Sequence, residues 1–251
     1  MKKIITFLFA CFLFYNSQAQ FGDLKKWVKK DSSKSVLQKV STNFPASGSR
    51  KLSNEDIING LKEALSTGAI NSTKILSKPD GFFTNQAIKI IMPEEAKKVE
   101  STLRSFGMSS LVDKAVLSMN RAAEDAAGGV SSIFLNAIKQ MTVTDGINIL
   151  KGGDFAATDY LKKMTTVGLT EKMRPVIETS LAKVNATQHW NSVFSNYNKF
   201  SNKKVDTDLA AYVTTKALNG LFYSISLEEQ KIRKDPAAQV SELLKRVFGG
   251  K

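Results

Sequence analysis

The chain has 251 residues, of which 42% are hydrophobic, and a formal net charge of +13 from 36 Lys and Arg against 23 Asp and Glu. The single Cys and single His exclude an internal disulfide framework, a multi-cysteine zinc site and metallohydrolases that need two histidines. Length and apolar content together predict a folded domain with a sizeable core, not a disordered or fibrous chain.

Residues 1–19 have the order of a secretory signal peptide. A basic start precedes an uncharged apolar run over residues 4–15, and Ser17-Gln18-Ala19 offers small residues for cleavage before Gln20. The run is too short to span a bilayer, so no transmembrane helix is expected in the mature chain. Lipidation at Cys11 is disfavoured because the apolar run continues past it. We therefore expect a periplasmic or otherwise extracytoplasmic protein.

The lead segment over residues 20–51 carries more than half of the net charge of the expected mature chain, which is +11 once Lys2 and Lys3 are removed. Between residues 21 and 51, eight Lys and Arg stand against two Asp, a balance of +6. Apolar residues recur there at helical spacing, at Phe21, Leu24, Trp27 and Val28. We favour docking of this stripe on the protein's own domain. The alternative is peripheral contact with an anionic membrane through a basic face that comprises Lys25, Lys26, Trp27, Lys29 and Lys30.

Residues 52–249 are predicted to form a single all-α domain. Helix signals follow one another along this stretch and no convincing pair of strands appears. We expect a compact multi-helix bundle of about nine or ten helices, with no sheet. Ser53, with Asp56 three residues later, predicts a capping box at the first helix, and Lys78-Pro79-Asp80-Gly81 predicts a turn.

The middle of the domain is predicted to hold a series of shorter helices. We interpret residues 87–92 as a short helix, because a lone strand there would have no partner. Pro93 is expected to begin the next helix and Gly107 to end it. Ser110 is then predicted to cap a longer helix. Further helices are expected over residues 131–141, 145–151, 155–164, 171–184 and 186–200.

The C-terminal stretch has the clearest helix signals. Residues 208–222 are amphipathic. Ser226 and Glu229 match a second capping box, which predicts that a new helix begins there. Asp235-Pro236 predicts one more helix start, because it places an N-cap residue before a proline.

The most distinctive run for chemistry lies in the helix that follows Ser110. Asn120, Arg121 and Glu124 occupy the polar side of this helix, opposite a stripe of Met and Ala. One hypothesis makes them a ligand-binding cluster that faces a pocket, with Arg121 as a bidentate anion clamp. The interpretation that we favour is a solvated helix face with surface ion pairs.

Asp145 marks a second candidate site. It follows Thr144 and lies close to the loop Lys151-Gly152-Gly153-Asp154, so two helix N-termini near one turn offer an anion site. Helix capping and termination explain the same residues without a ligand. Thr144 and Asp154 would be N-caps, and Gly152 would end a helix.

The remaining signals point away from catalysis, cofactors and nucleic acid. His189 has no nucleophile at a recognisable spacing and no second histidine as a metal partner, so we expect a surface or half-buried ring. No phosphate-binding glycine motif and no calcium loop occurs, so no cofactor or metal is expected. The domain beyond the lead segment is only mildly basic, so no nucleic-acid partner is expected.

Several runs along the domain also resemble a known family. They lie at residues 60–65, 79–82, 119–124, 145–152, 157–160, 212–214, 216–222 and 243–249. On these runs the chain resembles an uncharacterised bacterial family, family 4197 of the domains of unknown function. The resemblance implies an exported, mostly helical protein and no known reaction. It favours the interpretation that Asn120, Arg121 and Glu124 have a shared role, because the run that contains them is one of those that resemble the family.

Three functional hypotheses follow from the sequence. We favour a non-enzymatic domain of the cell envelope that binds a small or apolar ligand or another envelope protein, because no nucleophile–base pair or metal set is evident. The second is a hydrolase that uses carboxylates together with Arg121. The third is a peripheral membrane protein held by residues 21–39.

Overall fold

The computed structural model describes residues 53–200, 202 and 204–234, and every regular element within them is helical. The predicted all-α class is therefore confirmed for this part of the chain. Contacts divide the protein into two units, Met1–Arg50 and Lys51–Lys251, and the described helices belong to the second. In chain order they are α1 (Asn54–Leu76), the 3-10 helix η1 (Glu94–Ala96), α2 (Lys97–Ser105), α3 (Ser109–Ala127), α4 (Ser131–Gln140), α5 (Val143–Lys151), α6 (Ala156–Lys183), α7 (Ala186–Phe200) and α8 (Leu209–Lys234).

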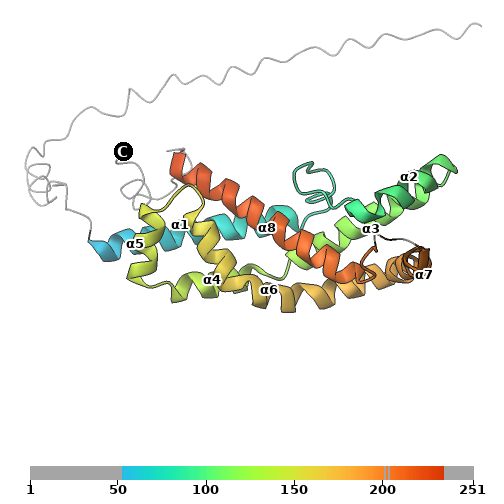
Figure 1. The fold of residues 1–251 in the computed structure, drawn as a ribbon. Coiled ribbons are helices and arrows are strands. Elements are labelled where there is room, and N and C mark those ends of the chain that lie inside the picture. Colours follow the sequence, from blue (N-terminus) through green and yellow to red (C-terminus); the bar gives the residue numbers. More distant parts are fainter. Residues whose placement is uncertain (1–52, 201, 203, 235–251) are drawn as a thin grey trace, which may run out of the picture. The chain divides into compact units, whose positions relative to one another are not determined.

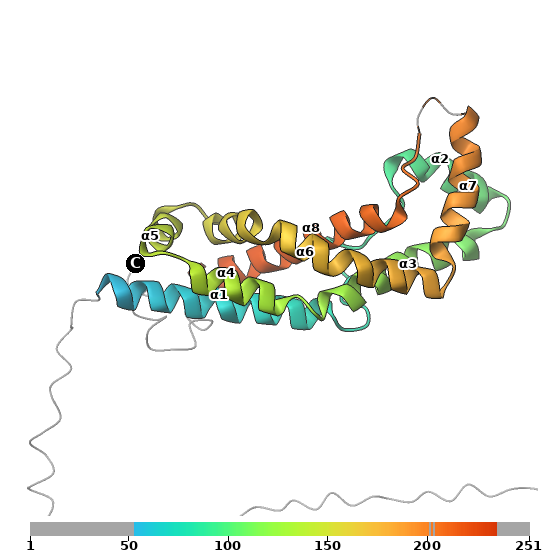
Figure 2. The same cartoon turned by 90° about the horizontal axis from the view of Figure 1, so that it is seen from below.

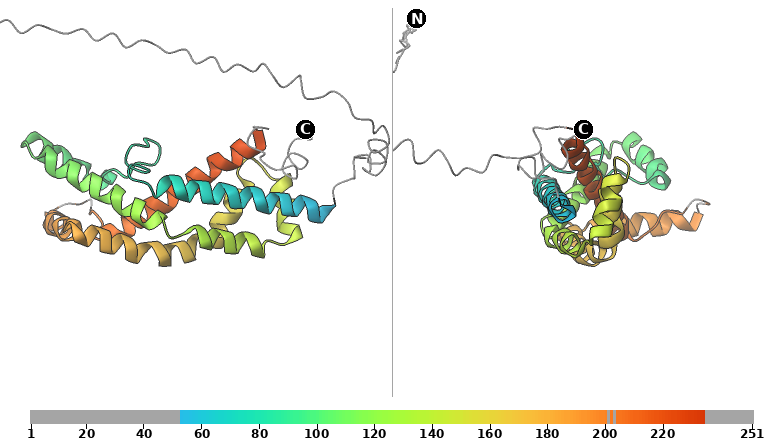
Figure 3. Two further views of the ribbon diagram at one scale, coloured as in Figure 1. Left: turned by 180° about the vertical axis from the view of Figure 1, so that it is seen from behind. Right: turned by 90° about the vertical axis from the view of Figure 1, so that its left-hand side faces the viewer.

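Helix α8 makes extensive contacts with two other long helices. It packs along both α6 and α1, and α3 contacts α6 and α8 in turn. Figure 1 shows α8 running obliquely across α1. Helices α4 and α5 pack against α1 and α6 at one end of the unit. The hairpin of α2 and α3 lies with α7 at the opposite end, as Figures 2 and 3 show.

Helix α6 connects the two ends because its buried stripe winds around it. Leu161, Leu169, Met173, Ile177 and Leu181 are fully buried, and most of these positions are four residues apart. Four residues advance about 400° on a helix, so each step turns the stripe by about 40°. One helix thereby meets α4 and α5 near its start and α3 and α7 near its end.

Two predicted helix breaks do not exist, which is one reason why the described part holds fewer helices than expected. The stretch that separates the predicted helices 155–164 and 171–184 continues α6. Its threonine hydroxyls donate to carbonyls four residues earlier in the same helix, so none of them caps a new helix. The capping box predicted at Ser226 is also wrong. Ser226 lies inside α8, and its hydroxyl donates to the carbonyl of Tyr223.

The short helix predicted over residues 87–92 is absent. These residues form turns and irregular backbone within the 77–93 connection, the stretch that joins α1 to η1. The alternation is nevertheless real, because Ile88, Ile90 and Met92 are buried whereas Ile91 is half exposed. The connection buries alternate side chains, as a strand does. Its backbone bonds to the side chain of Asn120 on α3 and not to a neighbouring strand.

The predicted helix ends are partly confirmed. Ser53 accepts from the amide of Asp56 at 3.0 Å and donates its own amide to the carboxylate of Asp56 at 3.1 Å, so the capping box is real. Gly107 follows α2 with a φ of +79°, a conformation that favours glycine. The cap at Ser110 is wrong, because α3 already begins at Ser109.

Several predictions fall on residues that the structure does not describe. They concern the signal peptide over 1–19, the lead segment with its basic face, and the helix predicted after Asp235. Among the helices that are described, none is long and apolar enough to cross a membrane.

Candidate functional site

Asn120 does not face solvent but holds the 77–93 connection against α3. It is 0% exposed. Its carbonyl accepts from the amide of Ile90 at 2.9 Å, and its amide nitrogen donates to the carbonyls of Ile90 and Val116, both at 2.7 Å. The side chain thus pairs with both backbone groups of Ile90, as a neighbouring strand would. Both amide protons of Asn120 are used inside the protein.

Glu124 holds the same connection one helical turn further on. Its carboxylate is 3% exposed and accepts from the amides of Phe82 and Phe83 at 3.0 and 3.1 Å. Arg121 donates to the other carboxylate oxygen at 2.6 Å and reaches Asp80 at 2.7 Å. These hydrogen bonds raise the pKa of Arg121, and they supply the opposite charge that a buried carboxylate requires.

The three residues predicted as a ligand-binding cluster are therefore brought together, but around the backbone of their own chain. Asn120 and Glu124 are buried, in contrast to the solvated face that we favoured from sequence. None of the three lines any of the four best-formed cavities of the described part. Their contacts explain a structural role, and a ligand at this cluster stays a prediction.

A second buried carboxylate of the same kind went unnoticed in the sequence. Glu229 of α8 accepts from the amides of Ala157 and Thr158 at the start of α6, at 3.0 and 2.9 Å. Arg233 pairs with Glu229 at 2.9 Å and also donates to the carbonyl of Ile149. A helix N-terminus favours negative charge, so Glu229 fixes α6 on α8. The signal in the sequence was the spacing of Glu229 and Arg233, four residues apart on one helix.

Asp145 is part of the capping box at the start of helix α5. The N-cap is Thr142, not Thr144 as predicted, and it forms a capping box with Asp145. Hydrogen bonds from the side chain and backbone of Thr142 lower the pKa of Asp145. The predicted N-cap Asp154 instead pairs with Lys234 at 3.2 Å. Anion binding near Asp145 stays a prediction.

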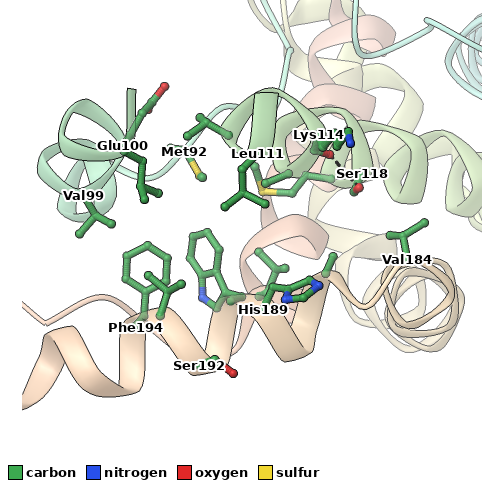
Figure 4. Close-up of a pocket in the computed structure, with 18 residues that line it drawn as sticks. Met92, Val99, Glu100, Leu111, Lys114, Ser118, Val184, His189, Ser192 and Phe194 are labelled. Carbon is green, nitrogen blue, oxygen red and sulfur yellow. Dashed lines mark hydrogen bonds between the residues drawn. The ribbon is translucent and has the colours of Figure 1, made fainter. Parts of the chain in front are cut away.

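The clearest cavity lies at the other end of the unit, between α7 on one side and α2 and α3 on the other. We call it the α3–α7 pocket, and its volume is about 420 Å³ (Figure 4). The α3 wall includes Leu111 and Ala115, and α7 supplies Trp190, Val193 and Phe194. Its apolar side chains come from segments far apart in sequence, so no local pattern identifies them as the lining of one pocket.

Trp190 forms a fixed part of the pocket wall. Its indole nitrogen donates to the carbonyl of Asp206 at 3.0 Å. The centroids of Trp190 and Phe194 are 4.3 Å apart, and Tyr197 packs edge-on against Phe194. These contacts hold the aromatic rings in one orientation, which produces a preformed apolar surface.

The pocket has three ionisable residues on its lining, and one of them is already paired. Glu100 accepts from Arg104 at 2.9 Å, and Arg104 also binds Asp113 at 2.9 Å. These two carboxylates raise the pKa of Arg104. The other two are Lys114 on α3 and His189 on α7, which are exposed at the rim. His189 therefore lies at the surface, as the sequence predicts.

A polar hollow of about 480 Å³ lies beyond Met92 and Trp190, which line both cavities. Its lining holds carboxylates and two lysines, namely Glu94, Glu95, Asp206, Lys204 and Lys216. Tyr212 donates to the carbonyl of Ile91 at 2.8 Å there. Burial, assisted by Glu95 and Glu94, raises the pKa of Tyr212 to about 12. Within the described residues, no group of three or more His, Cys, Asp or Glu is placed to hold a metal ion.

Comparison with known proteins places the chain in a family. The family described as "Protein of unknown function (DUF4197)" matches residues 51–249. The chain belongs to this family. The resemblance seen in the sequence is thereby confirmed, and no curated protein or solved structure matches the chain. Since the DUF4197 description states no activity, the function has to be argued from the geometry of the site.

Proposed function

We propose that this protein is a non-enzymatic binding protein that holds a small apolar ligand in the α3–α7 pocket. The observation that carries the proposal is a preformed pocket of about 420 Å³ with Trp190 and Phe194 on its wall. Ligand pockets typically measure about 300–1,000 Å³ and are lined mainly by apolar and aromatic side chains. The location that we propose is outside the cytoplasm, on the strength of residues 1–19.

The arrangement of polar groups favours binding over catalysis. The hydroxyls of Ser118 and Ser192 on the pocket lining donate to carbonyls of their own helices, at 2.8 and 2.9 Å. Among the described residues, no hydrogen bond joins His189 to a hydroxyl, as activation of a nucleophile requires. The hydrolase hypothesis draws no support from the pocket, because Asn120, Arg121 and Glu124 do not line it.

Fluorescence of Trp190 tests the proposal directly. The chain has two Trp residues, so Trp27→Phe leaves Trp190 as the only source of tryptophan emission. We expect the neutral dye N-phenyl-1-naphthylamine to bind saturably, one per chain, and to quench Trp190 by energy transfer.

A matched pair of variants places the dye. Val193→Asp puts a charge on the pocket wall, and Val167→Asp puts the same charge on the exposed surface of α6. We expect Val193→Asp to weaken dye binding at least tenfold, because a charge in an apolar site costs more than about 1.4 kcal/mol. Val167→Asp should leave binding unchanged. Absence of saturable binding, or equal binding by both variants, would contradict the proposal.

A further inference from the structure

Charge is unevenly distributed around the α3–α7 pocket. Of the ionisable residues on its lining, Glu100 is neutralised by Arg104, with which it makes two hydrogen-bonded contacts at 3.0 and 2.9 Å. The same guanidinium binds Asp113, the acidic neighbour of Lys114 in sequence, so both nearby carboxylates on α2 and α3 are occupied. Lys114 and His189 have no ion pair or side-chain hydrogen bond within the described part of the chain. The pocket thus offers cationic and donor groups that no acidic group of the described chain satisfies.

These two side chains lie toward one end of the pocket. Figure 4 shows Lys114 and Ser118 on α3 and His189 on α7 on opposite walls toward one end of the cavity, and Val99 and Phe194 toward the opposite end. A lysine ammonium carries three donors, and a histidine ring has an N–H donor in either protonation state. One end of the cavity therefore suits an anion and the other suits a hydrocarbon chain.

We infer that the ligand is a single-chain amphiphile with an anionic head group, a long-chain carboxylate, whose head lies between Lys114 and His189. This inference rests on the proposed function, because the chain must occupy the apolar part of the pocket. A single chain fits better than a two-chain lipid, since about 420 Å³ is near the lower end of ligand pockets. The carboxylate accepts charge-assisted hydrogen bonds from Lys114 and His189.

A series of straight-chain carboxylates tests the apolar end. Octanoate, decanoate and dodecanoate, each below its micellar concentration, are titrated to displace N-phenyl-1-naphthylamine in the Trp27→Phe background. We expect each added methylene to strengthen binding about fourfold until the pocket is full. Affinity that does not depend on chain length overturns the inference.

A head-group comparison tests the polar end. We expect dodecanoate to bind about tenfold more tightly than dodecanol or dodecyltrimethylammonium. Because two donors share this preference, Lys114→Gln and His189→Gln should each reduce it about threefold. Lys162→Gln, on the exposed surface of α6, is the matched control and should keep the full preference. Equal binding of the three head groups, or equal effects of Lys114→Gln and Lys162→Gln, overturns the inference.

Two further readouts separate the failures. The neutral dye should bind Lys162→Gln as well as it binds the parent protein, because Lys162 lies outside the pocket. If the dye binds but the head-group preference is absent, the inference fails and the proposed function stands; if the dye does not bind, both fail. Vesicles of phosphatidylglycerol test whether the anionic head group belongs to a bilayer lipid and not to a free carboxylate. Binding to them that depends on Lys114, with no displacement by dodecanoate, assigns the pocket to a bilayer lipid and overturns the inference.

Discussion

Replacement of Asn120 by alanine tests the contact that holds the 77–93 connection on α3. The wild-type side chain makes three hydrogen bonds, two to Ile90 and one to the carbonyl of Val116, and all are buried. A bond of this kind contributes about 1 kcal/mol net, but where a buried backbone group loses its partner the cost is instead the desolvation of that group, about 1–3 kcal/mol. The carbonyl and amide of Ile90 both lose their partner. We therefore expect Asn120→Ala to lower the free energy of unfolding by about 4 kcal/mol.

The assay is urea unfolding of the full chain, followed by circular dichroism. In a domain of this size, about 4 kcal/mol corresponds to a fall in Tm of roughly 8–16 °C. Asn136→Ala, on the exposed face of α4, is the matched control, and we expect it to change stability by less than about 0.5 kcal/mol. Asn120→Asp keeps the acceptor but loses both donors and buries a charge, so its loss at neutral pH should be at least as large.

The reasoning fails if Asn120→Ala and Asn136→Ala unfold at the same urea concentration. That result would mean that the connection holds to α3 through its apolar side chains alone. Native-state hydrogen exchange gives an independent measurement. The amide of Ile90 should exchange much faster in Asn120→Ala, whereas amides within α6 should follow only the global loss of stability.

Three further predictions follow from other contacts. Arg233→Ala leaves the buried carboxylate of Glu229 without its cation and should lower the free energy of unfolding in urea by about 3 kcal/mol. Lys234→Ala breaks an exposed ion pair and should lower it little. Equal losses in the two variants would contradict this reasoning. At Gly220 an added Cβ would lie 2.5 Å from a buried phenylalanine ring, but at Gly168 it would meet only an ordinary contact at 3.7 Å. Gly220→Ala should therefore be less stable than Gly168→Ala by about 2 kcal/mol, and the opposite order would refute the packing argument. Because burial raises the pKa of Tyr212 to about 12, the folded state keeps a proton that the unfolded state releases above its ordinary pKa of about 10. Stability should thus be intact below about pH 10 and fall as the pH rises from about 10 to 12, and Tyr212→Phe should reduce that fall in unfolding measured across this range; an identical profile would refute the assignment.

Local sequence signals predicted the helical class and several helix ends correctly. The capping box at Ser53 and the glycine after α2 are set by neighbouring residues, so no tertiary information was needed. The same local signals misled at Ser226. A Ser followed by Glu three residues later predicts a helix start. Here Glu229 instead accepts from backbone amides at the N-terminus of α6, and α8 continues through Ser226.

The run around Asn120 shows how far sequence reasoning reaches toward the candidate site. Periodicity placed Asn120, Arg121 and Glu124 on the polar side of a helix, and the family resemblance marked them as a set. Asn120 and Glu124 bind the backbone of a connection up to 42 residues away, and Arg121 reaches Asp80 in the same connection. No local pattern identifies such distant partners. Whether a polar helix face is solvated, lines a pocket or holds a loop depends on what packs against it.

The sequence by itself determined that this protein is helical, that it has too few Cys and His for disulfides or multi-histidine metal sites, and that its positive charge lies mostly ahead of the domain. These properties depend on composition and on residues close together in the chain. Only the tertiary structure decided that two carboxylates are buried and that α2, α3 and α7 enclose an apolar pocket. A pocket needs walls from separate helices. That Lys114 and His189 have no ion pair within the described part of the chain is recognised only when the partners of the neighbouring charges there are known.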